Sequence, residues 1–129
     1  MIYVDSSVVL ADVLTEDRRP PANFWERDDL VSSRLCEYEA WVRLHAYGCA
    51  ATHGPALANV LAHLDLLSLD EATCARCRAP FPVPVRTLDA LHLSAAEFLR
   101  SRGFLPEVAT YDARMRDAAA AMGFGLAAV

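Results

Sequence analysis

The chain of 129 residues contains no lysine, and its basic residues are 12 arginines. Aspartate and glutamate together number 17, so the net charge is −5 at neutral pH. Proteins that hold nucleic acid through bulk charge are strongly basic, because their binding energy comes from neutralising many phosphates. The composition argues against that class and leaves a localised site as the way to contact a nucleic acid.

A secretory signal is also missing, because residues 1–5 have neither a basic start nor a long apolar run. We therefore expect a cytoplasmic protein. The longest stretch without Asp, Glu or Arg covers residues 44–64, which is long enough to span a bilayer. Three histidines, Asn59 and the pair Gly54-Pro55 interrupt it, so we predict two helical pieces joined by a turn and no membrane segment.

The chain has four cysteines, and Cys74 and Cys77 form the only C-x-x-C pair. A zinc site needs a second closely spaced pair of Cys or His ligands, which the sequence lacks. A redox motif opens a helix directly after a strand, whereas Asp70 to Thr73 are typical of a helical turn preceding the pair. We interpret all four cysteines as free thiols: Cys36, Cys49, Cys74 and Cys77.

Short apolar runs alternate with helical patterns along a chain that has the length of one domain, residues 1–129. Strands are predicted at 2–4, 30–32, 66–69, 108–110 and 126–129. Helices are predicted after Ser7, after a cap at Ser33, over 71–78, over 88–102 after a cap at Thr87, and between Asp112 and Gly123. The alternation predicts a three-layer α/β/α fold, in which helices cover both faces of a mostly parallel sheet of four or five strands.

Four acidic residues occur where such a sheet opens its ligand-binding crevice. Asp5 ends the first strand, Asp112 follows the fourth, and Asp89 lies in the first turn of the helix over 88–102. Glu39 is the odd residue within an apolar stripe of Leu35, Tyr38, Val42 and Ala46. Crevices of parallel sheets lie beyond the carboxyl ends of the strands, so these acids can converge.

Convergent carboxylates raise one another's pKa unless a cation lies among them, and oxygen ligands suit Mg²⁺ or Mn²⁺. Each acid also has a purely structural explanation. Asp5 and Asp112 occupy helix-capping positions, and Asp89 favours the positive end of its helix. Glu39 could pair with Arg43, a contact worth about 0.3–0.5 kcal/mol. Four separate structural explanations for four acids are together less plausible than one shared binding site.

Residues 2–7, 33–39, 86–93 and 110–112, with Gly123 downstream, match a known family in order and spacing. They resemble the PIN-domain ribonucleases, and within these the VapC-type toxins of bacterial toxin-antitoxin pairs. The block Arg-Thr-Leu-Asp-Ala-Leu-His-Leu at 86–93 is its most specific part. The resemblance implies that Asp5, Glu39, Asp89 and Asp112 are catalytic and bind Mg²⁺ or Mn²⁺, and that Ser6 and Thr110 support them.

The same resemblance implies a metal-dependent endoribonuclease that cleaves RNA, such as tRNA or rRNA, and leaves a 5′-phosphate. It also implies a VapB-type antitoxin as partner and a homodimer. The apolar content of 54% suits such covered surfaces.

Arginine is the side chain best suited to phosphate, because its planar fork binds two oxygens at once. We take Arg86 and Arg114 as the leading RNA-binding candidates, followed by Arg76, Arg78, Arg100, Arg102 and Arg116. Asp117 lies about 140° around the helix from Asp112 and is expected to point away from the site. We interpret His92 as a core or partner-facing histidine rather than a metal ligand.

Three rival classes have different requirements. A non-catalytic PIN-like module that binds RNA or protein needs none of the acids, so the presence of all four favours an enzyme. A phosphoacceptor receiver domain needs a lysine, which is absent. A D-x-D phosphatase is disfavoured because Asp5 is followed by Ser6 and Ser7.

Overall fold

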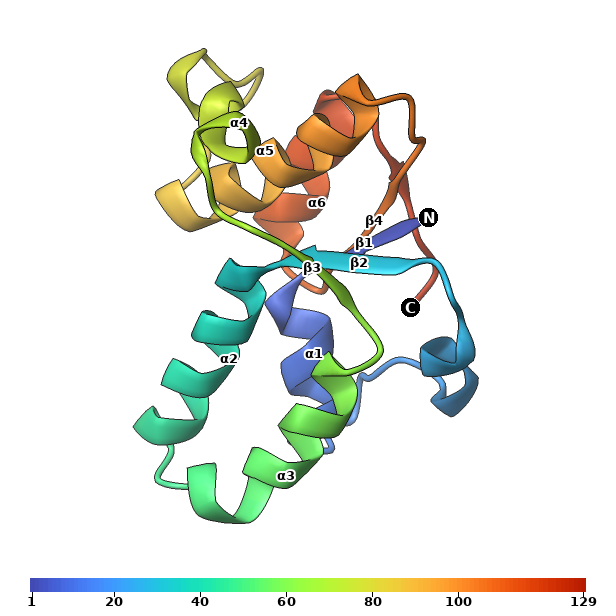
Figure 1. Cartoon of the computed structure of the whole chain (residues 1–129), viewed down its shortest axis with the longest axis vertical. Coiled ribbons are helices and arrows are strands. Elements are labelled where there is room, and N and C mark those ends of the chain that lie inside the picture. Colours follow the sequence, from blue (N-terminus) through green and yellow to red (C-terminus); the bar gives the residue numbers. More distant parts are fainter.

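A five-stranded sheet crosses the middle of the protein in the computed structural model, which describes all 129 residues (Figure 1). Every pairing is parallel and the strand order is β3-β2-β1-β4-β5. The strands are β1 (Ile2–Val4), β2 (Leu30–Ser33), β3 (Asp65–Leu67), β4 (Glu107–Ala109) and β5 (Gly125–Leu126). The predicted parallel sheet is confirmed, although its last strand is shorter than expected.

Helices form a layer on each face of this sheet. In the view of Figure 1, α1 (Ser6–Val13), α2 (Arg34–Ala46) and α3 (Ala50–Leu61) lie below it. Above it lie α4 (Glu71–Cys74), α5 (Thr87–Ser101) and α6 (Ala113–Ala121). Two 3₁₀ turns occupy Ala22–Glu26 and Ala75–Arg78. The three-layer prediction is confirmed, and no helix combines the length and the apolar character needed to cross a membrane.

Strand β1 is buried on both faces because it lies at the centre of the sheet. Successive side chains of a strand point to opposite faces. Ile2 and Val4 accordingly pack into the core formed with α1, α2 and α3, whereas Tyr3 packs into the core formed with α5 and α6. This alternation gives β1 a role in both layers.

The strand order reverses between β1 and β4. From β1 the chain proceeds through β2 to β3 by way of α1, α2 and α3, and it then crosses to the other side for β4 and β5. Ligand sites of open parallel sheets form at such a reversal, beyond the carboxyl ends of the strands. The backbone N–H of Asp5 donates to the carbonyl of Ala109 over 3.0 Å, so the ends of the two strands are joined at this point.

The turn expected at Gly54-Pro55 is wrong, because both residues lie within α3. The connection between α2 and α3 instead passes through Gly48, whose φ of +68° favours glycine. Gly54 serves close packing: a Cβ there would lie 3.0 Å from Cη2 of Trp41 on α2. Glycine at this position therefore lets two helices approach.

Two other local expectations need correction. The buried side of α2 carries Leu35, Cys36, Ala40 and Leu44, whereas Tyr38 and Val42 are exposed. The expected stripe is therefore right at Leu35 and wrong at Tyr38 and Val42. The caps expected from Ser33 and Thr87 do not form: Ser33 occupies the N-cap of α2 but its side chain makes no capping bond, and Thr87 is already the first residue of α5.

Candidate metal-binding active site

Asp5 is a buried carboxylate that directly follows β1. Its Oδ1 accepts a hydrogen bond from the backbone N–H of Ser6 at 2.8 Å. Its Oδ2 accepts from the hydroxyls of Ser7 at 2.7 Å and Thr110 at 2.8 Å. These donors compensate for the loss of water around a residue that is only 5% exposed. The expected contacts from Ser6 and Thr110 are present, and Ser7 is an addition.

Thr110 and Ser7 also hold the segment that follows β4. The backbone N–H of Asp112 donates to Thr110 Oγ1 at 3.0 Å, and that of Tyr111 donates to Ser7 Oγ at 2.9 Å. The two hydroxyls therefore link Asp5 to the start of α6. Asp112 caps this helix, since its Oδ1 accepts from the backbone N–H groups of Arg114 and Met115.

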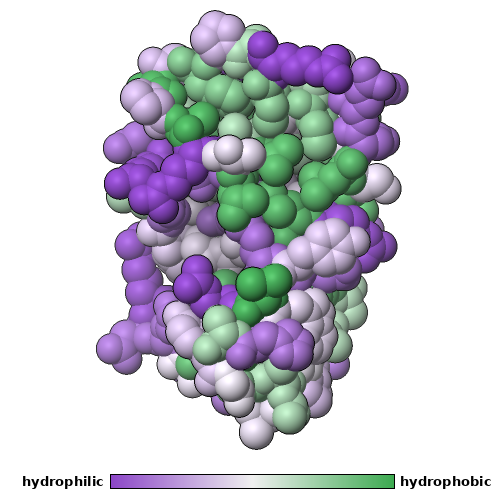
Figure 2. Space-filling view, turned by 90° about the vertical axis from the view of Figure 1, so that its left-hand side faces the viewer, coloured by the Kyte–Doolittle hydropathy of each residue, from purple (hydrophilic) through white to green (hydrophobic).

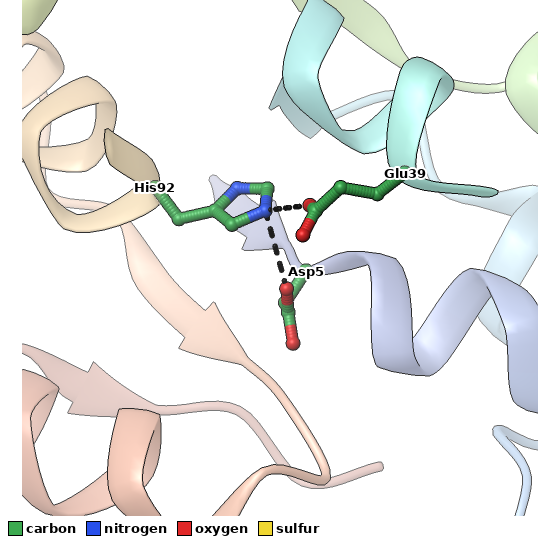
Figure 3. Close-up of side chains that lie close together, drawn as sticks. All are labelled: Asp5, Glu39 and His92. Atoms are coloured by element: carbon green, nitrogen blue, oxygen red, sulfur yellow. Dashed lines mark hydrogen bonds and ion pairs between the residues drawn. The ribbon is translucent and has the colours of Figure 1, made fainter. Parts of the chain in front are cut away.

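Glu39 and His92 approach Asp5 from helices on opposite sides of the sheet, α2 and α5 (Figure 3). His92 Nε2 lies 2.5 Å from Glu39 Oε1 and 3.4 Å from Asp5 Oδ1. On the other side of the ring, Nδ1 lies 2.9 Å from the Tyr3 hydroxyl. That hydroxyl donates its single proton to Ser33 Oγ at 3.1 Å, so it accepts from Nδ1–H. Both ring nitrogens then donate, which is the hydrogen-bonding pattern of a protonated imidazole.

The charges around His92 favour this protonated form. Burial by itself lowers the pKa of His92, but the hydrogen bond with Glu39 and the charges of Asp5, Glu39 and Asp89 outweigh it and raise the pKa above its ordinary value. Burial also raises the pKa of the Tyr3 hydroxyl, so it stays protonated and can donate to Ser33. In its protonated form, His92 balances part of the charge of the acids.

All four predicted acids line one cleft of about 370 Å³: Asp5, Glu39, Asp89 and Asp112. Asp89 is half-buried in the first turn of α5. Burial raises the pKa of Asp89, and the charges of Asp112 and Asp5 raise it further. The capping roles of Asp5 and Asp112 are real, but they coexist with convergence on the cleft.

The donor set fits a hard divalent cation. Asp5, Glu39 and His92 each offer a ligand atom within 4.8 Å of the others, and Asp89 and Asp112 line the same cleft outside this tight group. Carboxylate oxygens are the preferred ligands of Mg²⁺ and Mn²⁺, and a cation would relieve the repulsion that raises the pKa of Asp89. Because both nitrogens of His92 are engaged, we interpret it as the hydrogen-bond partner that orients the carboxylates.

The arginines divide into two groups. Arg86 lines the cleft and Arg114 is exposed beside Asp112. Most of the others have partners within the chain: Arg76 lies over the Phe81 ring, Arg78 pairs with Glu71, Arg100 pairs with Glu97, and Arg102 lies over Phe98. These four arginines therefore have contacts within the chain that explain their presence without a bound phosphate.

The sequence did not assign Ser7 or Arg43 to the cleft, and it placed His92 as a core or partner-facing histidine without its bond to Glu39. His92 lies within the most specific sequence block, one turn after Asp89, and that spacing was the available signal. Arg43 lines the cleft but does not pair with Glu39, which contacts His92 instead. Asp117 is exposed and lines no part of the cleft, as its helical angle predicts.

Comparison with known proteins agrees with this geometry. The family model of the PIN domain matches residues 2–121. The chain therefore belongs to the PIN domain family. Within it, the similarity is to VapC ribonucleases of Mycobacterium tuberculosis. Ribonuclease VapC46 is 36% identical over 129 residues, covering 98% of this chain and 96% of that protein. Ribonuclease VapC35 is 32% identical over 133 residues, covering 99% and 96%.

The raised pKa of His92 predicts how the stability of the metal-free protein depends on pH. A raised folded-state pKa contributes stability that is fully present below the unfolded value and is lost as pH rises through the folded value. In EDTA, the unfolding free energy should therefore fall as pH rises above about 6.5, the ordinary pKa of histidine. His92→Gln keeps a hydrogen-bond donor but cannot titrate, so its unfolding free energy should decrease less over the same pH range. Urea unfolding of both proteins measures it, and parallel pH profiles would contradict the protonated His92.

Proposed function

We propose that this chain is a metal-dependent endoribonuclease and the toxin component of a toxin-antitoxin pair. It hydrolyses phosphodiester bonds of RNA, in tRNA or rRNA, and acts in the cytoplasm where those RNAs occur, with residues 1–129 as a single PIN domain. The observation that carries the proposal is the convergence of Asp5, Glu39, Asp89 and Asp112 on one cleft at the strand-order reversal. The names of the VapC relatives support the same activity.

The four acids would hold Mg²⁺ or Mn²⁺. When bound, such a cation supplies activation of water for attack and neutralisation of negative charge on a phosphate. The hydrogen bonds that Ser7 and Thr110 donate to Oδ2 hold the Asp5 carboxylate in one orientation. The hydrogen bond from His92 to Oε1 orients Glu39 in the same way. One of the acid side chains would also orient the attacking water by accepting a hydrogen bond from it.

Phosphate contacts must come from a small number of arginines, because the net charge is −5. Arg86 lines the cleft at the beginning of α5 and is the first candidate. Arg114 lies at the beginning of α6, two residues after Asp112, and is the second candidate. Each can bind two oxygens of one phosphate.

Asp5→Asn and Asp89→Asn should each lower RNA cleavage by more than about 100-fold, because even residues behind metal ligands are worth roughly 10–100-fold. Cleavage of a labelled RNA with Mn²⁺ measures the effect, with EDTA as the metal-free reference. Asp117→Asn is the matched control, since it removes an exposed acid outside the cleft. Circular dichroism verifies that each variant is folded.

The alternative function, a non-catalytic PIN-like module that binds RNA or protein, gives the opposite result in this assay. RNA would remain intact with the wild-type protein and Mn²⁺. Cleavage that persists in folded Asp5→Asn, or in EDTA, would overturn the metal-dependent mechanism.

Metal binding also has a readout that is independent of activity. A cation that binds only the folded state adds about 2.7 kcal/mol of stability at roughly 100 times its dissociation constant. The melting temperature should therefore rise with Mn²⁺ or Mg²⁺ in the wild type and in Asp117→Asn. The rise should vanish in Asp5→Asn, whose amide removes a charge from the tight group. A melting temperature indifferent to millimolar cation in all three proteins would contradict the site.

We also propose two protein partners, a second copy of this chain and a VapB-type antitoxin. The helices beside the cleft expose apolar side chains: Val42 on α2 is 69% exposed and Leu88 on α5 is 49% exposed. Figure 2 shows hydrophobic residues gathered over the middle of this side of the molecule. Such patches commonly mark protein interfaces.

Co-expression with the small protein encoded beside this chain tests both partners. We expect relief of growth arrest and a complex that contains two copies of this chain, as measured by light scattering. A monomer that forms no complex and whose toxicity is unrelieved would exclude both.

A further inference from the structure

A second cavity opens beside the catalytic cleft. Its volume is about 340 Å³, at the lower end of the roughly 300–1,000 Å³ of small-ligand pockets. Four residues line both cavities: Ser7, Leu10, Arg43 and Asp112. The two spaces are therefore neighbours separated by single side chains, and a ligand in the cleft has direct access to the second cavity.

Two tyrosines distinguish the second cavity from the cleft. Tyr47, at the end of α2, is 60% exposed, and Tyr111 follows β4. Each ring has an arginine over it: the Arg43 guanidinium carbon lies 5.8 Å from the centre of Tyr47, and that of Arg18 lies 4.7 Å from the centre of Tyr111. Aromatic rings combined with guanidinium planes are the usual surfaces on which unpaired RNA bases stack.

The charges in the second cavity indicate which part of a nucleotide fits there. Glu16 and Asp112 contribute two carboxylates against the single guanidinium of Arg43, so the balance of charge disfavours a phosphate. A base carries no such charge, and a carboxylate can accept hydrogen bonds from its amino groups. The apolar side chains of Leu10 and Leu14 complete a lining that suits a planar ring. Phosphate is better accommodated in the cleft, where Arg86 and a bound cation would offset the charge of the acids.

We propose that this second cavity binds the base of an unpaired RNA nucleotide next to the scissile phosphate, with Tyr47 as its stacking surface. Arg43 lies between the two spaces and contacts the substrate where backbone and base diverge. The inference rests on the proposed ribonuclease function and deepens it by naming where a base of the substrate binds. A fully paired base cannot leave its stack to occupy the cavity without the cost of unpairing.

Two substitutions at Tyr47 distinguish the effect of aromatic stacking from the effect of side-chain volume. Tyr47→Leu keeps apolar volume but removes the aromatic face, and it should raise the KM for a single-stranded RNA about tenfold with little change in kcat. Tyr47→Phe retains the ring and should behave as wild type. Phe104→Ala is the matched control, because Phe104 is a 46% exposed aromatic residue that lines neither cavity.

A spectroscopic readout supplements the kinetics. RNA oligonucleotides that carry 2-aminopurine at successive positions are bound to Asp5→Asn, which keeps them uncleaved. Stacking on a tyrosine quenches the fluorescence of this base, so one position should be quenched in Asp5→Asn and in its combination with Tyr47→Phe. The quenching should disappear when Tyr47→Leu is added. A purely structural role of Tyr47 would not move this signal.

The outcomes are distinguishable from failure of the ribonuclease proposal. Absence of Asp5-dependent cleavage by the wild type would overturn that function. Asp5-dependent cleavage with unchanged KM and quenching in Tyr47→Leu would overturn only the base-binding cavity. The cavity would also be reassigned, and this inference overturned, if Tyr47→Leu weakened the complex with the antitoxin while RNA binding stayed the same.

Discussion

Concentrated negative charge in a partly buried cleft is the constraint that shapes this site. Asp5 is only 5% exposed, and Glu39, Asp89 and Asp112 share its cleft. Carboxylates removed from water and placed together are unfavourable unless donors or cations surround them. The fold supplies hydroxyl and backbone donors to Asp5 and a buried imidazole to Glu39. In the proposed function a divalent cation would complete this compensation and supply the chemistry, so charge balance and function would have the same origin.

The sheet determines the positions of the hydrogen-bond donors that surround these carboxylates. Because β1 is central and alternates its side chains, Tyr3 enters the layer of α5 while Val4 enters the layer of α1 to α3. The Tyr3 hydroxyl then supports His92 on α5, and His92 reaches across to Glu39 on α2. These hydrogen bonds between Tyr3, His92 and Glu39 thereby connect both helical layers to the strand that precedes Asp5. Displacement of either layer would disturb the same carboxylates.

The two adjoining cavities suggest a division of labour in recognising RNA. The cleft gathers acids with Arg86 and suits a phosphate bound together with a cation, whereas the neighbouring space offers aromatic and apolar surface. Recognition by a few oriented groups explains how an acidic chain without lysine can act on a polyanion. Long-range attraction contributes little here, so the local arrangement has to supply the affinity.

Local patterns in the sequence were sufficient for the strands, the layer arrangement and three of the acids. Asp5 and Asp112 follow strands, and Asp89 opens a helix, so chain position alone directs them to the crevice. The helix end at Gly123 was equally predictable, because this glycine adopts the positive φ that glycine tolerates. Tertiary contacts decided the rest. The inner face of α2, the place of Gly54 against Trp41 and the partners of His92 all depend on residues from other elements. Glu39 is 53 positions from His92, and Tyr3 is 89, so no local periodicity encodes these contacts; only the packing of α2 and α5 against β1 creates them.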